Sequence, residues 1–224
     1  MTNQEIFSYI DHTQLSAVAT WADVKKLCDE AITYKTASVC IPPSFVKRAS
    51  EYVKDQVAIC TVIGFPLGYN TTAVKIFEAK EAVDNGANEV DMVVNLGDVK
   101  DKAFDKVTEE IRQIKNAIGD KVLKVIVETC YLTEDEKIAL CKCVTESGAD
   151  FIKTSTGFGS GGANIEDIEL FKEHIGSNVK MKASGGVRTK EAIEMFINAG
   201  CQRIGTSSAI KALTNERIGD QNGY

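Results

Sequence analysis

The chain has 224 residues, of which 44% are hydrophobic and 26% are charged, and its formal net charge is −6 at pH 7. This acidic balance argues against a nucleic-acid surface, and no apolar run approaches the roughly 18 residues that a membrane span needs. The first residues lack the basic region and apolar core of a signal peptide, so we expect a cytoplasmic protein.

Predicted strands and helices alternate along the whole chain after a short N-terminal helix. The predicted strands are 9–13, 37–41, 57–63, 89–94, 122–129, the run around Lys153, 179–184 and 203–206. The predicted helices between them are 21–34, a segment ending near 54, 71–84, 102–118, 133–147, 165–174 and 188–198. In the 71–84 helix, the pattern predicts an apolar face containing Ala73, Ile76, Phe77 and Val83.

Strict alternation of apolar strands with helices indicates an α/β protein with a parallel sheet. About eight repeats in this length favour a single-domain (β/α)8 TIM barrel over residues 1–224. An open, doubly wound sheet is the alternative, but it would usually carry a glycine-rich dinucleotide or P-loop motif, and neither motif is present.

The seven cysteines and two histidines follow no disulfide or zinc pattern. Cys40, Cys60 and Cys130 lie in or just after apolar runs, where cysteine behaves as a small hydrophobic residue. We therefore predict no metal site and a reducing compartment. Cys40 lies near the end of a predicted strand and is a candidate reactive thiol, although burial in the core is the simpler interpretation.

A lysine interrupts the apolar run that precedes the loop TSTGF. Alone, Lys153 would be interpreted as a strand-edge side chain reaching solvent. However, a glycine ends the helix before each of three strands, and the residues five positions later are Asp91, Lys153 and Gly205. Equal loop lengths predict that Asp91 and Lys153 share an interior layer of the barrel.

The segment KASGGVRT predicts a phosphate site. It places Lys182 near the end of the seventh strand and then has two glycines and Arg188 at the start of a helix. Backbone N–H groups at such a position bind phosphate, and many barrels bind it after strands seven and eight. The loop after strand eight, from Gly205 to Ser208, matches this location.

Lys153 and Lys182 lie on neighbouring predicted strands and are both candidates for the interior, which predicts carbonyl chemistry. Two ammonium groups in one desolvated mouth lower the pKa of at least one, and a neutral amine can attack a carbonyl. Asp91 could exchange protons with the substrate. Lys124 and Glu128 have the same parity on the fifth predicted strand, so they could form an interior charged pair with a structural or a functional role.

These segments resemble the deoxyribose-phosphate aldolases, a family of class I, Schiff-base-forming enzymes with a (β/α)8 barrel. The resemblance runs through IDHTQL, SVCIPPSFV, VIGFPLG, GANEVDMVVNLG, KVIVET, GADFIKTSTGF, KASGGVRT and IGTSS. It implies cleavage of 2-deoxyribose 5-phosphate to glyceraldehyde 3-phosphate and acetaldehyde, with no metal or organic cofactor. It also implies small phosphorylated sugars and aldehydes as partners, and a homodimer or higher homo-oligomer.

The resemblance assigns roles to individual residues. Lys153 would form the imine, and Asp91 and Lys182 would form the proton relay. Asp11, Thr13 and Lys124 match supporting polar positions inside the mouth. The positions that match the phosphate site are Gly157, Gly185, Gly186, Arg188, Gly205, Ser207 and Ser208.

Two positions depart from the family pattern, and the last residue matches it. Phe158 stands where some relatives have lysine, which removes a cation from the phosphate site. Ala209 stands where glycine is expected. Tyr224 matches a terminal tyrosine that assists proton transfer in relatives.

Two other functions are consistent with parts of the pattern. A Schiff-base barrel of the transaldolase type would transfer three carbons rather than release acetaldehyde. A barrel that only binds a sugar phosphate would explain the glycine loops and Arg188, but not two interior lysines beside Asp91.

Overall fold

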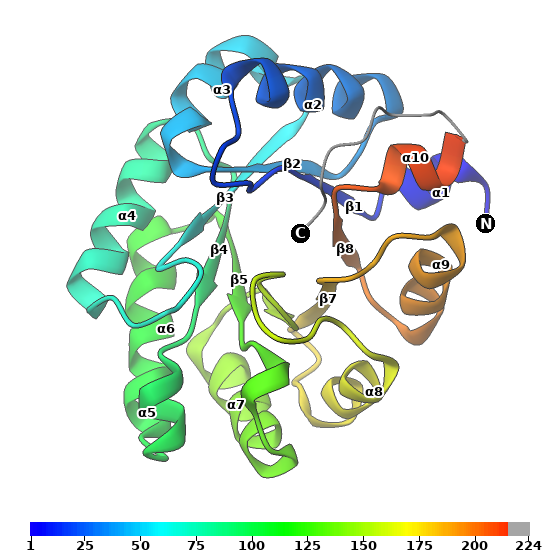
Figure 1. Cartoon of the computed structure of the whole chain (residues 1–224). Helices are drawn as coiled ribbons and strands as arrows, with labels where there is room; N and C mark the ends of the chain where they lie inside the picture. The colour runs from blue at the N-terminus through cyan, green and yellow to red at the C-terminus, as the bar shows by residue number, and fades with distance from the viewer. Residues whose placement is uncertain (215–224) are drawn as a thin grey trace.

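The protein is a closed barrel of eight parallel strands in a computed structural model that describes residues 1–214. Each strand pairs with the next in sequence, and β8 pairs with β1, so the (β/α)8 prediction is confirmed. The helices form an outer ring around the strands (Figure 1). Among the described helices, none is both long enough and apolar enough to cross a membrane.

The strands are β1 (Ile10–Thr13), β2 (Ser38–Ile41), β3 (Ala58–Ile63), β4 (Glu89–Val93), β5 (Val122–Ile126), β6 (Phe151–Lys153), β7 (Lys180–Ser184) and β8 (Arg203–Thr206). The α-helices are α1 (Asn3–Phe7), α2 (Trp21–Tyr34), α3 (Val46–Val53), α4 (Thr72–Asp84), α5 (Leu96–Lys100), α6 (Phe104–Ile118), α7 (Glu134–Ser147), α8 (Ile165–His174), α9 (Lys190–Ala199) and α10 (Ala209–Thr214). Short 3-10 helices are η1 (Pro43–Phe45), η2 (Lys54–Gln56) and η3 (Thr129–Tyr131).

Local sequence signals define most helix ends. Thr20 and Thr133 form capping boxes with the acidic residue three positions later, which satisfies free N–H groups at the starts of α2 and α7. Gly148 and Gly200 end α7 and α9 in the left-handed region, as expected for glycine after a helix. These ends return the chain to the barrel at regular intervals.

Helix α4 differs from its predicted packing. Of the predicted apolar face, Ile76 and Val83 pack partly buried against the core, whereas Ala73 is exposed and Phe77 is 68% exposed. The fully buried positions are Lys75, Ala79 and Ala82. Lys75 is buried because its Nζ donates to Glu110 Oε2 at 2.8 Å and to the carbonyl oxygen of Val93 at 2.9 Å. A buried ion pair thus holds α4 against the barrel, at a position where the hydrophobic pattern predicted no buried side chain.

Strand β5 is shorter than predicted. It ends at Ile126 rather than near 129, because Glu128 has a left-handed backbone (φ 54°, ψ 65°) and η3 follows. Helices α5 and α10 were not predicted. These differences lie at the ends of strands, where the loops of the mouth begin.

Candidate active site

Strand β6 places Lys153 at its last residue, on the interior of the barrel. Its Nζ lies 2.7 Å from Asp91 Oδ2, and Lys182 Nζ lies 2.8 Å from the same oxygen. Lys153 and Lys182 are also register partners on β6 and β7. The structure therefore brings the three predicted reactive residues together in one buried contact.

The carboxylate of Asp91 is the centre of this contact. Its second oxygen, Oδ1, accepts from Lys124 Nζ at 2.9 Å and from the Cys60 thiol at 3.1 Å. Burial alone would raise the pKa of Asp91, but the ammonium groups of Lys124, Lys153 and Lys182 hold that pKa well below its usual range. Asp91 is a carboxylate at neutral pH, with hydrogen-bond donors on both oxygens.

Asp11 forms a second acidic centre beside Lys182. Its carboxylate contacts Lys182 Nζ and accepts from the Ser38 hydroxyl at 2.8 Å and Arg203 Nη1 at 3.1 Å. Burial opposes ionisation, yet Lys124, Lys182 and Arg203 lower the pKa of Asp11. Burial likewise lowers the pKa of Lys182, but Asp11 and Asp91 outweigh it and raise that pKa above the ordinary lysine value. Lys182 therefore holds a proton next to Asp91.

Glu89 and Arg203, which were not predicted from the sequence, complete the interior network. Arg203 Nη1 and Nη2 both donate to Glu89, at distances from 2.8 to 3.0 Å. Glu89 precedes Asp91 by two residues on β4 and therefore shares its face. Arg203 likewise precedes Gly205 by two residues on β8. The alternation of side chains along each strand was thus the sequence signal that could have identified Glu89 and Arg203.

Lys124 lies at the junction of the three carboxylates. Its Nζ contacts Glu89, Asp91 and, at 3.5 Å, Asp11. Burial lowers the pKa of Lys124, but Asp11 and Asp91 raise it well above the ordinary value. The predicted pair of Lys124 with Glu128 is wrong, because Glu128 lies beyond the end of β5 and accepts from Thr156 instead.

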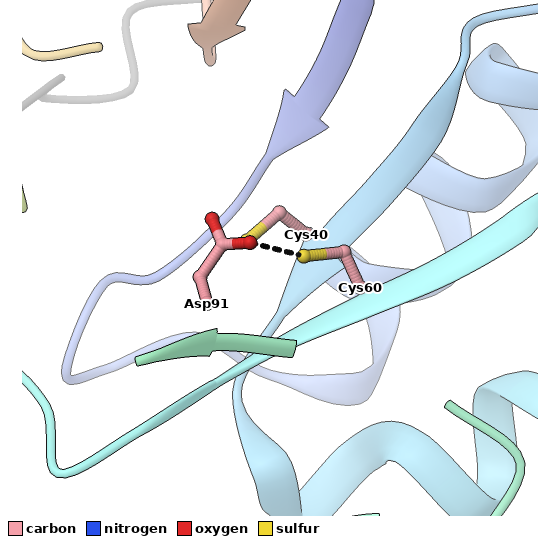
Figure 2. Close-up of side chains that lie close together, drawn as sticks. All are labelled: Cys40, Cys60 and Asp91. Carbon is pink, nitrogen blue, oxygen red and sulfur yellow. Dashed lines mark hydrogen bonds between the residues drawn. The ribbon is translucent and has the colours of Figure 1, made fainter. Parts of the chain in front are cut away.

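Two cysteines lie against this network (Figure 2). The sulfurs of Cys40 and Cys60 and an oxygen of Asp91 lie within 4.8 Å of one another, which is close enough for a metal ion to be considered. Burial, Cys40 and Asp91 raise the pKa of Cys60 well above its ordinary value, so it is a thiol that donates to Asp91. A divalent cation would also face the three ammonium groups on Asp91. These three side chains therefore do not suit a metal. Cys40, the candidate reactive thiol, is buried in a small apolar cluster with Leu15 and Val62.

A cleft opens beside Lys153 at the carboxyl ends of the strands. Gly157, Gly185 and Gly186 have positive φ values, a conformation that side chains disfavour. The residues that line the cleft are Thr13, Leu15, Lys153, Thr156, Gly157, Ser184, Gly185, Gly186, Val187, Arg188, Gly205, Thr206, Ser207 and Ser208. Every residue predicted for the phosphate site lines this cleft.

The two sequence departures have different structural settings. Phe158 is 43% exposed and its ring packs edge-on against Phe65, with centroids 5.4 Å apart. Ala209 is fully buried at the start of α10, so its methyl group belongs to the core. Tyr224 lies outside the described residues.

Comparison with known proteins agrees with this geometry. The family model described as DeoC/LacD family aldolase matches residues 6–210. The chain belongs to the DeoC/LacD aldolase family. Its enzyme class is therefore that of the carbon–carbon lyases.

Relatives named deoxyribose-phosphate aldolase match almost the whole chain. One from Clostridioides difficile (strain 630) is 63% identical over 217 residues, covering 97% of this chain and 99% of the relative. One from Clostridium botulinum (strain Alaska E43 / Type E3) is 62% identical over 216 residues, covering 96% and 98%. A solved structure described as a tetrameric deoxyribose phosphate aldolase from Aeropyrum pernix is 31% identical, with a TM-score of 0.87, covering 96% of this chain and 92% of that one.

Proposed function

We propose that this aldolase reversibly cleaves 2-deoxy-D-ribose 5-phosphate to D-glyceraldehyde 3-phosphate and acetaldehyde. The observation that carries the proposal is the contact of Lys153 with Asp91 and Lys182 beside a glycine- and serine-lined cleft. The relatives' names agree with this substrate. Such a reaction would serve the breakdown of deoxyribose phosphates.

Lys153 is the proposed nucleophile. Its neutral amine adds to the aldehyde carbon C1 of the open-chain sugar, and loss of water leaves a protonated imine. Removal of the proton from the C3 hydroxyl then breaks the C2–C3 bond, and the bonding pair passes into the imine to give an enamine. Protonation at C2 and hydrolysis release acetaldehyde and restore the amine. The imine nitrogen is the electron sink in this scheme.

Asp91 and Lys182 are the proposed proton relay. Asp91 is an ionised carboxylate in contact with Lys153, so it can accept a proton. Lys182 holds a proton 2.8 Å from that carboxylate and can return it. Asp11 and Lys124 support the relay by fixing the positions of Lys182 and Asp91. Thr13 lines the cleft beside them.

The loops after β6, β7 and β8 are the proposed phosphate site. Glycines at 157, 185, 186 and 205 let the backbone approach closely, and Ser207 and Ser208 add hydroxyl groups. Arg188 lines the cleft and supplies a positive charge, whereas Phe158, the neighbour of Gly157, supplies none. Backbone donors therefore provide much of the recognition.

Reductive trapping tests the proposal. Acetaldehyde followed by borohydride should leave one ethyl group on Lys153, detected by intact mass and peptide mapping. Lys153→Ala should lose both the adduct and the cleavage activity. Product analysis separates the transaldolase alternative, because acetaldehyde appears only from the proposed reaction. A wild-type protein that forms no adduct would favour a binding protein instead.

The proposed assembly is a homodimer or higher homo-oligomer in the cytoplasm. Four large apolar side chains are exposed in the loop after β3 and on α4, and association would cover them: Leu67, Tyr69, Val74 and Phe77. The seven free cysteines fit a reducing compartment. Light scattering tests the assembly, and a monomeric mass would contradict it.

A further inference from the structure

Glu128 has an unusual backbone for a large charged residue. It lies two residues after β5 with φ 54° and ψ 65°, in the left-handed region that favours glycine. Its side chain is only 2% exposed. Such backbone conformations persist where the surrounding structure enforces them, and they cluster at functional sites.

Hydrogen bonds on both sides enforce this conformation. The backbone N–H of Val127 donates to the carbonyl oxygen of Lys153 at 3.0 Å, and that of Thr129 donates to Thr154 at 3.0 Å. The chain before and after Glu128 is thus attached to β6 and its extension. The residue between is turned so that its carboxylate reaches the loop after Lys153.

Both carboxylate oxygens of Glu128 accept from Thr156. The backbone N–H of Thr156 donates to Oε1 at 3.1 Å, and its hydroxyl group donates to Oε2. The same hydroxyl oxygen accepts from the backbone N–H of Phe158 at 3.0 Å. A chain of hydrogen bonds therefore fixes the turn on either side of Gly157.

The loop also lies close over the carboxylate. A side chain at Gly159 would approach Glu128 Oε1 to 3.2 Å and Cys130 Sγ to 2.9 Å. Thr156 and Gly157 line the cleft, whereas Glu128 does not. The carboxylate therefore contacts Thr156 in the cleft wall without lining the cleft itself.

We propose that Glu128 is a positioning residue that holds the 156–158 turn in the geometry that binds the substrate phosphate. This inference rests on the proposed function for the identity of the sugar, but the anion-binding part is independent of it. The N–H groups of Thr156 and Phe158 are used inside the turn, which leaves the N–H of Gly157 between them to face the cleft. Its direction depends on the turn, so loss of the carboxylate should weaken phosphate binding and spare imine formation.

Two variants separate the side chain from the backbone. Glu128→Gly removes the carboxylate and keeps the left-handed conformation accessible. Glu128→Gln has nearly the same shape and keeps one acceptor oxygen. Lys35→Gly is the matched control, because Lys35 has a similar backbone (φ 56°, ψ 54°) at the end of α2, away from the cleft.

The first measurement is the affinity of the unliganded protein for inorganic phosphate, determined by calorimetry. We expect Glu128→Gly to weaken it about tenfold, as for loss of a charged hydrogen bond, and Glu128→Gln to lie between it and wild type. KM for the phosphorylated sugar should rise by a similar factor. KM for unphosphorylated 2-deoxyribose and trapping of Lys153 by acetaldehyde should stay within about twofold. Lys35→Gly should match wild type throughout.

Unchanged phosphate affinity in both Glu128 variants would overturn the inference, as would an equal loss for phosphorylated and unphosphorylated sugars. If Glu128→Gly does not fold, Glu128→Gln alone decides by the same criteria. A wild-type protein that binds phosphate but cleaves no deoxyribose phosphate would refute the proposed function and leave the phosphate comparison valid.

Discussion

Replacement of Asp91 by asparagine should separate imine formation from turnover. The carboxylate contacts three ammonium groups at 2.7, 2.8 and 2.9 Å. At an effective dielectric constant near 20, each contact has a Coulomb attraction on the order of 6 kcal/mol. Desolvation cancels much of this attraction, and breaking a buried ion pair costs about 3–5 kcal/mol of stability. Asp91→Asn should therefore lower the free energy of unfolding by roughly that amount.

The effect on catalysis should be selective. Imine formation depends on the amine of Lys153 itself, which the substitution of Asp91 leaves in place. Trapping by acetaldehyde and borohydride should therefore persist. Cleavage and C2 protonation need the relay, and a positioned acid–base group contributes about 10²–10⁴-fold. Turnover should fall by that factor while the trapped fraction stays near one per chain.

The assay compares single-turnover trapping with steady-state release of acetaldehyde. Glu110→Gln is the matched control, because Glu110 is also a buried carboxylate in contact with a lysine, outside the barrel interior. It should lose comparable stability and keep its turnover. An Asp91→Asn enzyme that remains folded and turns over at the wild-type rate would refute the relay. One that remains folded but no longer traps would refute the separation of the two steps.

Two further predictions concern charge. Phe158→Lys should add an exposed cation next to Gly157 of the cleft and tighten inhibition by inorganic phosphate about two- to fivefold, consistent with one exposed charge contact. An unchanged inhibition constant would contradict this. The lowered pKa values of Asp11 and Asp91 mean that each binds protons more readily when unfolded, so their stabilisation is present above about pH 4 and is lost as the pH falls further. Urea unfolding between pH 5 and 3 should show stability falling by up to about 1.4 kcal/mol per pH unit for each carboxyl group, and Asp11→Asn should remove one such contribution. Equal slopes in both proteins would contradict the assignment.

The barrel was predictable because its signals are local and periodic. Apolar runs alternate with amphipathic segments, and glycines mark the ends of helices before the strands. Counting from those glycines gives the parity of Asp91 and Lys153, and parity decides which side chains point inward. The structure places both side chains in the interior, in contact with each other.

The contacts of these residues were less predictable, because the alternation along a strand indicates on which face a side chain lies but not which residues it contacts. The sequence placed Lys124 and Glu128 on one face of a strand, but the strand ends before Glu128. That end depends on hydrogen bonds to β6, which is distant in sequence. Phe77 shows the same limit, since helical periodicity favoured its burial while the Lys75–Glu110 pair sets the buried face of α4.

The contacts and the access of the interior cations distinguish Lys153, the proposed nucleophile, from its neighbours. Lys124 contacts three carboxylates, whereas Lys182 and Arg203 contact two each. The contact recorded for Lys153 is with one carboxylate, Asp91, which two other ammonium groups also contact. With four cations on three carboxylates, the least compensated charge lies at Lys153, beside the cleft. An amine that attacks a carbonyl must be within reach of its substrate, and of these four cations it is Lys153 that lines the cleft.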